Sequence, residues 1–282
     1  MCLIIGIAAL FLMAELVREQ LTFKTTAYEI PFTANEAGDE PLKIVFLSDL
    51  HNHVYGKSND TLIKAIASLS PDLILIGGDM LVGKKKAGFK KALTFCKNLP
   101  QIAPTYYALG NHEQRMKEEP EKYNASFAAY KDELTRAGIY FLENESEIVD
   151  LKGRGLCLAG LEIPLSCNTH FHKGHLELEE VEERIGTCPS SYTILMAHNP
   201  SYVSTYLKWG ADMVLSGHYH GGLVRIPGMG GIISPDFTVF PRYSGEYTKV
   251  GKQHVIVSKG LGTHTFHIRF IDPAEIVLLK LK

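Results

Sequence analysis

Five short polar clusters carry the residue types that bind metal ions, and each of them follows an apolar run. The clusters are Ser48-Asp49-Leu50-His51, Gly77-Gly78-Asp79, Gly110-Asn111-His112-Glu113, Ala197-His198-Asn199-Pro200 and Ser216-Gly217-His218-Tyr219-His220. One histidine at the end of a strand is usually structural, but a succession of such clusters indicates a shared site. Carboxylate, imidazole and amide donors without a thiolate suit divalent manganese, iron or zinc.

The clusters contain seven potential donors, more than a single ion usually takes. They are Asp49, His51, Asp79, Asn111, His198, His218 and His220. Two metal ions that share one bridging carboxylate would use the whole set. Such a pair, roughly 3.5–4 Å apart, clamps a phosphoryl group and lowers the pKa of a bound water, so that a nucleophile forms at neutral pH. The residues therefore predict metal-assisted hydrolysis of a phosphate ester.

Two local features are expected to bring these donors together. Side chains two positions apart point to the same side of a strand, so Asp49 and His51 would face one centre if the strand continued through them. The same holds for His218 and His220. Glycines beside the donors would let the backbone pass close to a ligand; they are Gly78, Gly110 and Gly217.

The apolar runs before the clusters read as strands that are buried on both faces. They cover residues 43–47, 73–76, 105–109, 194–197 and 213–215. Helical patterns lie between or after them, over residues 59–69, 89–99, 123–137, 177–185 and 200–209, and further strands are expected at 254–258, 266–270 and 276–281. Alternating strands and helices predict an α/β sandwich with its ligands at the carboxyl ends of the strands. We expect one domain over residues 41–282.

Composition narrows the class of protein. The chain has 282 residues, 45% of them hydrophobic, with 29 Lys+Arg against 31 Asp+Glu, which excludes a disordered chain and argues against a basic nucleic-acid-binding protein. Its five cysteines form no Cys-x-x-Cys pair, so neither a disulfide framework nor a zinc ribbon is indicated. A lysine cluster between Lys84 and Lys91 is interpreted as a solvated face.

The amino-terminal segment, residues 1–20, contains an uninterrupted apolar stretch from Leu3 to Met13. A membrane-spanning helix needs roughly 17–25 apolar residues, so this stretch is short. Three interpretations stay open: a short signal-anchor, a cleaved export signal, or a buried amphipathic element of the domain. The first two predict a membrane-associated or exported protein whose side of the membrane the sequence leaves undetermined.

Taken in order, the clusters resemble those of the calcineurin-like metallophosphoesterases. Within that family the sequence is most similar to a bacterial membrane-associated subgroup that includes the YkuE and YaeI phosphodiesterases and the LpxG-type hydrolases of the lipid A pathway. The matches are Ser48 to His51, Gly78-Asp79-Met80, His198-Asn199-Pro200, Ser216 to Gly222, Val224 to Pro227, and the tail from Gly260 to Arg269. The resemblance implies a four-layer α-β-β-α sandwich of the metallo-dependent phosphatase type.

The resemblance also implies a role for each donor. One ion would be held by Asp49, His51, Asp79 and His220, and the other by Asp79, Asn111, His198 and His218, with Asp79 bridging and manganese favoured. His112 would contact the phosphoryl group and protonate the leaving oxygen. The implied substrate is a phosphodiester or pyrophosphate, membrane-proximal or lipid-linked. The alternative is a non-catalytic scaffold of this fold that binds protein partners.

Three further features bear on the site. The tail around Arg269 departs from the pattern of the subgroup, so a contact between Arg269 and substrate is undecided. The histidines His170, His172 and His175 are expected to lie on a surface loop near the mouth of the cleft. The position three residues after Asp79 is Val82 and not tyrosine, which argues against a tyrosinate-bound ferric site.

Overall fold

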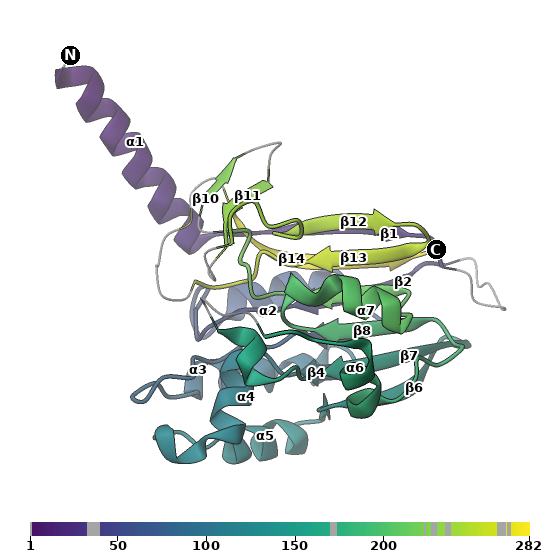
Figure 1. Ribbon diagram of the computed structural model, residues 1–282. Helices are drawn as coiled ribbons and strands as arrows, with labels where there is room; N and C mark the ends of the chain where they lie inside the picture. The colour runs from purple at the N-terminus through teal and green to yellow at the C-terminus, as the bar shows by residue number, and fades with distance from the viewer. Residues whose placement is uncertain are drawn as a thin grey trace.

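The computed structural model describes residues 2–32, 40–169, 174–222, 224–226, 230–234, 238–263, 269 and 272–282. Two six-stranded sheets face each other at the centre of the molecule, and helices cover their outer faces (Figure 1). The predicted α/β sandwich is therefore confirmed.

The first sheet brings together strands from both ends of the chain. Its order is β1 (Phe23–Ile30), β14 (Ala274–Leu281), β2 (Leu42–Leu47), β3 (Leu73–Ile76), β4 (Thr105–Ala108) and β5 (Ile139–Leu142). The strands from β2 to β5 are parallel, while β14 runs antiparallel to β2 and parallel to β1. The amino-terminal strand β1 precedes residue 41 and completes the edge of this sheet.

The second sheet is also mixed. Its order is β12 (Glu246–Val250), β13 (Gln253–Val257), β9 (Met213–Ser216), β8 (Thr193–Ala197), β7 (Arg154–Leu161) and β6 (Glu145–Leu151). The four central strands are parallel and the two edge strands are antiparallel to their neighbours. A separate antiparallel hairpin is formed by β10 (Val224–Ile226) and β11 (Gly230–Ile233).

The helices divide between the two outer faces. They are α2 (Asp60–Ser68), α3 (Lys90–Cys96), α4 (Asn111–Glu118) and α5 (Phe127–Arg136) on the side of the first sheet, and α6 (Leu178–Ile185) and α7 (Val203–Trp209) on the side of the second. Short 3₁₀ turns are η1 (Leu99–Gln101), η2 (Pro120–Lys122), η3 (Leu165–Asn168) and η4 (Pro200–Tyr202).

Successive side chains of a strand point to opposite faces of its sheet, and this produces three apolar cores and therefore four layers. In β2, Val45 and Leu47 pack in a core shared with α2, α3 and α5, whereas Ile44 and Phe46 pack in the core between the two sheets. A third core joins the second sheet to α6 and α7. A buried parallel strand must be apolar on both faces, which explains the continuous apolar runs and confirms the four-layer α-β-β-α arrangement.

Several elements differ from the sequence expectation. Helix α4 begins at Asn111 inside the Gly-Asn-His-Glu cluster and was not predicted, because its residues form no apolar stripe. The expected helix at 89–99 is shorter, ending at Cys96 before η1. Asn59 occupies the start of α2 in a left-handed conformation without capping the helix, and its side-chain oxygen instead accepts a hydrogen bond from the backbone of Tyr55. The strand expected at 266–270 lies mostly outside the described residues.

Helix α1 (Cys2–Leu21) projects from the body of the molecule, beside the β10–β11 hairpin (Figure 1). Among the described residues, no helix combines the length and the apolar composition that crossing a membrane requires. The carboxyl end of α1 contacts the domain, since buried Glu19 accepts hydrogen bonds from the backbone N–H of Asp272.

Candidate metal centre

The loops that follow five strands deliver the predicted donors to one edge of the facing sheets. Asp49 and His51 follow β2, Asp79 follows β3, Asn111 follows β4, His198 follows β8, and His218 and His220 follow β9. Parallel strands end at the same edge of a sheet. The structure therefore brings all seven side chains into one region.

The strands do not continue through the paired donors, although Asp49 and His51 do face one centre. Strand β2 ends at Leu47 and β9 ends at Ser216, so the donors lie in tight loops. Five of the seven donors have left-handed backbone conformations, with φ between 47° and 67°; they are Asp49, His51, Asp79, His218 and His220. Such conformations cost about 1–2 kcal/mol for each non-glycine residue, and strain of this kind concentrates at functional sites.

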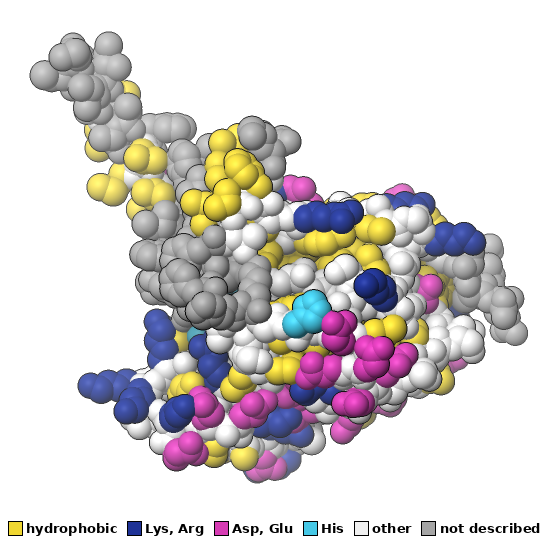
Figure 2. Space-filling model, viewed as in Figure 1, with side chains coloured by type: hydrophobic (Ala, Val, Ile, Leu, Met, Phe, Trp, Pro, Cys, Tyr) yellow, Lys and Arg dark blue, Asp and Glu magenta, His cyan; other side chains and the backbone are white. Residues whose placement is uncertain are grey.

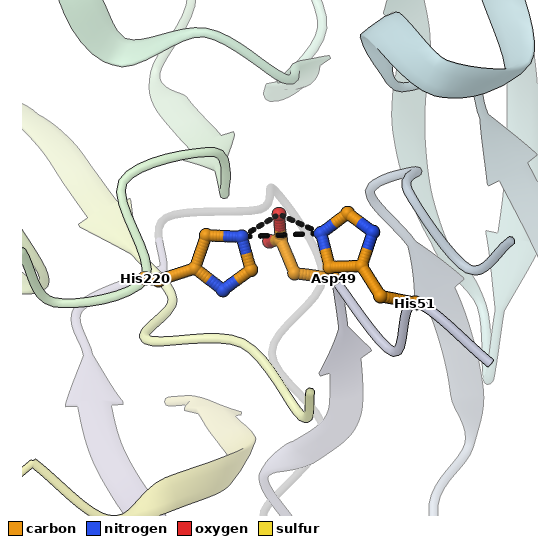
Figure 3. Close-up of side chains that lie close together, drawn as sticks. All are labelled: Asp49, His51 and His220. Carbon is orange, nitrogen blue, oxygen red and sulfur yellow. Dashed lines mark hydrogen bonds and ion pairs between the residues drawn. The ribbon is translucent and has the colours of Figure 1, made fainter. Parts of the chain in front are cut away.

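The first group of donors consists of Asp49, His51 and His220 (Figure 3). The Nε2 atom of His220 lies 3.3 Å from Oδ1 of Asp49, and Nε2 of His51 lies 3.7 Å from the same oxygen. The two Nε2 atoms are 3.1 Å apart. The side chains point toward one another from two different loops, as three ligands of one ion would.

The second group consists of Asp79, His198 and His218. Nε2 of His198 lies 3.1 Å from Oδ2 of Asp79. The side-chain oxygen of Asn111 faces Nδ1 of His218 at 2.9 Å and Oδ2 of Asp79 at 3.2 Å. Rotation of this amide would turn its NH₂ group toward the same atoms and its oxygen toward Arg115, so Asn111 meets the group either as a hydrogen-bond donor or as an oxygen ligand.

Asp79 connects the two groups. Its Oδ2 atom lies 3.9 Å from Nε2 of His51 in the first group and within 3.1 Å of His198 in the second. Its other oxygen accepts a hydrogen bond of 2.8 Å from the backbone N–H of His112, which fixes the orientation of the carboxylate. This is the position that a bridging carboxylate would occupy between two ions.

Backbone carbonyl groups set the tautomers of two of the histidines. Nδ1 of His198 lies 2.7 Å from the carbonyl oxygen of Gly77, and Nδ1 of His220 lies 3.1 Å from that of Gly262. A carbonyl can only accept, so in each neutral ring the proton is on Nδ1 and the lone pair is on Nε2, facing the site. Metal-ligating histidines commonly use this arrangement.

The electrostatics of the site favour a cation between the donors. Burial by itself would raise the pKa of Asp79, but the imidazoles of His198 and His112 outweigh burial and hold it well below its usual range. Burial would lower the pKa of His198, yet Asp79 and Asp49 raise it to about 10. The two carboxylates thus draw positive charge beside them, as a proton or as a metal ion. Because the buried Nε2 of His198 makes no hydrogen bond and faces carboxylate oxygens, the donor set fits a metal ion.

His112 lies beside His51 and Asp79, with its ring centroid 5.0 Å from that of His51, and is oriented differently from the donors. The backbone N–H of Gly83 donates to its Nδ1 at 2.8 Å, so the neutral ring carries its proton on Nε2. That Nε2 atom lies 3.9 Å from Oδ2 of Asp79. His112 therefore presents an N–H group toward the centre, which suits a proton donor better than a metal ligand.

Comparison with known proteins agrees with this geometry. Residues 42–222 match the model of the calcineurin-like phosphoesterase family. The chain belongs to this family. It is similar to Phosphodiesterase YaeI of Escherichia coli (strain K12), with 26% identity over 95% of this chain and 88% of YaeI. It is also similar to the uncharacterized metallophosphoesterase YkuE of Bacillus subtilis (strain 168), with 26% identity over 92% of this chain and 85% of YkuE.

Among solved structures, the phosphopantetheinyl hydrolase PptH from Mycobacterium tuberculosis matches with a TM-score of 0.46 and 12% identity, over 78% of this chain and 89% of PptH. The family and the paired groups of buried His and Asp residues show that the protein is a metal-dependent phosphoesterase, a hydrolase whose donors are consistent with a dinuclear centre. The enzyme interpretation is confirmed, and the identity of the metal stays a prediction.

Glycines in this phosphoesterase allow the donor loops to approach one another. A Cβ atom on Gly78 would lie 2.0 Å from the backbone nitrogen of Gly110, and one on Gly110 would lie 2.2 Å from Oδ1 of Asp79. A Cβ atom on Gly217 would lie 2.1 Å from Oδ2 of Asp49. The predicted role of these three glycines is confirmed, since any side chain would displace the backbone or a predicted donor.

Glu113 accepts hydrogen bonds from the backbone of the two loops that carry Asp79 and Asn111. Its buried carboxylate accepts hydrogen bonds from the backbone N–H groups of Asp79, Met80 and Gly110, at 2.8, 2.9 and 3.2 Å. The hydroxyl of Tyr107 donates to it as well. Burial, together with the nearby charge of Asp79, raises the pKa of Glu113 to about 7. The sequence placed Glu113 in the motif, but only the structure shows which groups it orients.

Arg269 does not face the site of the phosphoesterase. It is buried, and its guanidinium donates to the carbonyl oxygens of Lys259, Gly260 and Gly262, at 2.6, 3.3 and 2.7 Å. The carbonyl of Gly262 is the one that meets Nδ1 of His220. Arg269 therefore positions a loop that supports a predicted donor, a role that its sequence position did not reveal.

The remaining histidines are dispersed. His53 contacts the carbonyl of Gln20 at the end of α1, at 2.9 Å, and His254 pairs with the hydroxyl of Tyr247 on the second sheet. The side chain of His175 is exposed and lies beside Glu177. His170 and His172 lie outside the described residues, so their expected position near the cleft stays a prediction.

Proposed function

We propose that this phosphoesterase hydrolyses a phosphodiester or pyrophosphate bond of a membrane-proximal or lipid-linked substrate, in the manner of the bacterial YkuE, YaeI and LpxG-like subgroup. The two groups of donors joined by Asp79 are the observation that carries the proposal. The name of YaeI as a phosphodiesterase supports a diester substrate. The apolar segment at residues 3–13 supports a location at a membrane, on a side that we leave undefined.

In this proposal Asp49, His51, Asp79 and His220 hold one divalent ion, and Asp79, Asn111, His198 and His218 hold the other. Manganese is favoured, with iron or zinc as alternatives, because the donors are oxygen and imidazole nitrogen atoms. When bound, the two ions would polarise the phosphoryl oxygens and lower the pKa of a water nucleophile. Asp79 and the two carbonyl-anchored histidines keep the ligands in place during the reaction.

His112 supplies the proton for the leaving group. The N–H of Gly83 occupies its Nδ1 atom, so the Nε2 proton is directed toward the centre, where the leaving oxygen of the ester would lie. A positioned proton donor of this kind typically contributes about 10²–10⁴-fold to the rate. A leaving alkoxide gains most from such a donor, which is consistent with an ester of an alcohol as substrate.

The proposal is tested with the full chain stripped of metal by chelation and then supplied with manganese, iron or zinc. Hydrolysis of bis-p-nitrophenyl phosphate is compared with hydrolysis of p-nitrophenyl phosphate, and metal content is measured on the active protein. We expect the diester to be hydrolysed in the presence of added metal, with two ions per chain. Hydrolysis of the monoester alone, or activity with no divalent ion bound, would overturn the proposal.

A further inference from the structure

A loop rich in lysine borders the site next to His112. Residues 83–91, here called the lysine loop, include the first two residues of α3. The segment begins at Gly83, whose N–H contacts His112, and the carbonyl of Gly88 accepts a hydrogen bond of 3.0 Å from the side chain of Asn52. Asn52 directly follows the predicted donor His51. The lysine side chains of the loop are exposed; they are Lys84, Lys85, Lys86, Lys90 and Lys91. Both ends of this basic loop are thus attached beside predicted site residues.

Helix α1 is attached to the same region. Its last turn contacts the domain through Glu19, which accepts from Asp272, and through the carbonyl of Gln20, which meets Nε2 of His53. His53 lies two residues after His51. Beyond this attachment the helix exposes large apolar side chains, each between 44% and 72% accessible; they are Ile7, Leu10, Leu12, Met13, Val17 and Leu21.

A third exposed feature is attached to the loop of His220. Arg225 at the start of the β10–β11 hairpin donates to the carbonyl oxygen of Gly221, at 3.1 Å, and Gly221 directly follows His220. The hairpin and the segment paired with it expose apolar side chains, called here the hairpin surface; they are Ile226, Val239 and Phe240. In Figure 2, hydrophobic side chains gather on α1 and on the neighbouring hairpin.

We infer that these three features together dock the protein on an anionic lipid bilayer, with the metal centre facing the headgroups. The inference rests on the proposed function and names the partner of that site. Apolar side chains on two protrusions would enter the boundary between headgroups and acyl chains, while the lysine loop would neutralise anionic headgroups. The chain as a whole has a formal charge of −2, so the basic loop is a local feature beside the site and not a general property of the surface.

The combination of basic and apolar side chains favours a bilayer over the other possible partners. A nucleic acid would meet the lysines but offers nothing for the exposed apolar side chains of α1 and Phe240. A second copy of the chain could cover the apolar side chains, but a symmetric contact through the same surface would bring its own lysine loop against the first. An anionic bilayer matches both kinds of side chain, and it would present a phosphate ester directly to the site.

The test is flotation of the full chain with vesicles of phosphatidylcholine alone or with added phosphatidylglycerol. The variant Lys84→Gln/Lys85→Gln/Lys86→Gln is compared with a control that loses three lysines at the opposite edge of the sheets, Lys208→Gln/Lys249→Gln/Lys252→Gln. Lys208 lies at the end of α7, Lys249 near the end of β12 and Lys252 in the β12–β13 turn. This edge holds the amino ends of β13 and β9, opposite the edge that carries the site.

We expect the wild-type protein to bind anionic vesicles more tightly than neutral ones. The lysine-loop variant should lose roughly 100-fold in partitioning to anionic vesicles, since each lysine near such a surface contributes about fivefold. The control should lose little. Val239→Ser/Phe240→Ser should weaken binding to both kinds of vesicle. Circular dichroism verifies that every variant is folded.

Equal loss in the lysine-loop variant and the control would overturn the inference, as would absence of vesicle binding by the wild-type protein. A wild-type dimer that becomes monomeric in Val239→Ser/Phe240→Ser, without vesicle binding, would assign the surface to a second copy. Diester hydrolysis by the same preparation separates the two proposals. Hydrolysis without vesicle binding refutes only the docking surface, and vesicle binding without metal-dependent hydrolysis refutes only the proposed reaction.

Discussion

Replacement of Gly217 by alanine should disable the metal centre without unfolding the protein. The new Cβ atom would lie 2.1 Å from Oδ2 of Asp49 and 2.0 Å from Oγ of Ser48, whereas real Cβ contacts almost never fall below 3.0 Å. Asp49 must therefore move by about 0.9 Å. Its carboxylate also accepts from the backbone N–H of His218, at 3.1 and 3.2 Å, so the displacement reaches a donor of the second group.

A misplacement of about 1 Å at reacting groups can cost about 10²-fold in rate, and overpacking typically costs about 1–3 kcal/mol of stability. We expect Gly217→Ala to lose at least one metal ion and about 10²-fold in kcat on bis-p-nitrophenyl phosphate. The measurements are metal content, steady-state kinetics and thermal unfolding.

The matched control is Gly155→Ala in β7. A Cβ atom there would meet nothing within 4 Å, and the residue needs no positive φ. The free energy of unfolding of Gly155→Ala should change by no more than about 0.5 kcal/mol, as for most surface substitutions. The kcat of this variant should equal that of the wild-type protein. If Gly217→Ala kept two ions and wild-type turnover, the close approach of these loops would have no catalytic consequence and the reasoning would fail.

Three further predictions follow from the site and its surroundings. Asp79→Asn should lose both metal ions, whereas His112→Ala should keep them and lose about 10²–10⁴-fold in kcat on a diester with an alkoxide leaving group. Metal analysis that finds an empty centre in His112→Ala would contradict the role of a proton donor. Arg269→Ala should destabilise the fold by about 3 kcal/mol in urea unfolding, because four buried carbonyls lose a charged donor. It should also weaken metal binding through His220. Arg269→Lys should restore part of both, and an alanine variant with full metal affinity would refute the positioning role. Burial raises the pKa of Asp272 from 3.8 to about 6, although Arg269 opposes this rise, so the folded state binds the extra proton and stability falls as pH rises from about 4 to 6. Asp272→Asn should remove this loss of folding stability, which amounts to about 3 kcal/mol above pH 6 in the wild-type protein. Identical slopes of Tm against pH in the wild-type protein and the variant would contradict the prediction.

The sequence was sufficient to predict where the donors meet. Strand β3 matches its predicted bounds, and β2, β4, β8 and β9 match theirs within two residues. Each run is apolar throughout because it is buried on both faces, which is a strong local signal. Since parallel strands end at a common edge, the order of the clusters along the chain was enough to gather them.

The local geometry could not be predicted in the same way. Left-handed conformations at Asp49 or His220 cost energy because both residues carry a Cβ atom, and they persist because surrounding contacts over-determine them. The contacts of Arg269 and Glu113 are to backbone groups of other loops, and no pattern of spacing encodes such partners. Helix α4 lacks an apolar stripe because its first residues, Asn111 to Glu113, serve the site and its loops.

The position of β14 between β1 and β2 has a consequence for biosynthesis. Phe23 pairs with Ala274, and among the described strands β1 has no neighbour other than β14. A chain that emerges from the ribosome amino end first cannot pair β1 in this sheet until β14 has been made. Strand β1 therefore waits without a strand partner while β2 to β13 are made, although the contact between Gln20 and His53 can form earlier. A premature stop codon before Ala274 would leave β1 without its partner strand while sparing every predicted ligand.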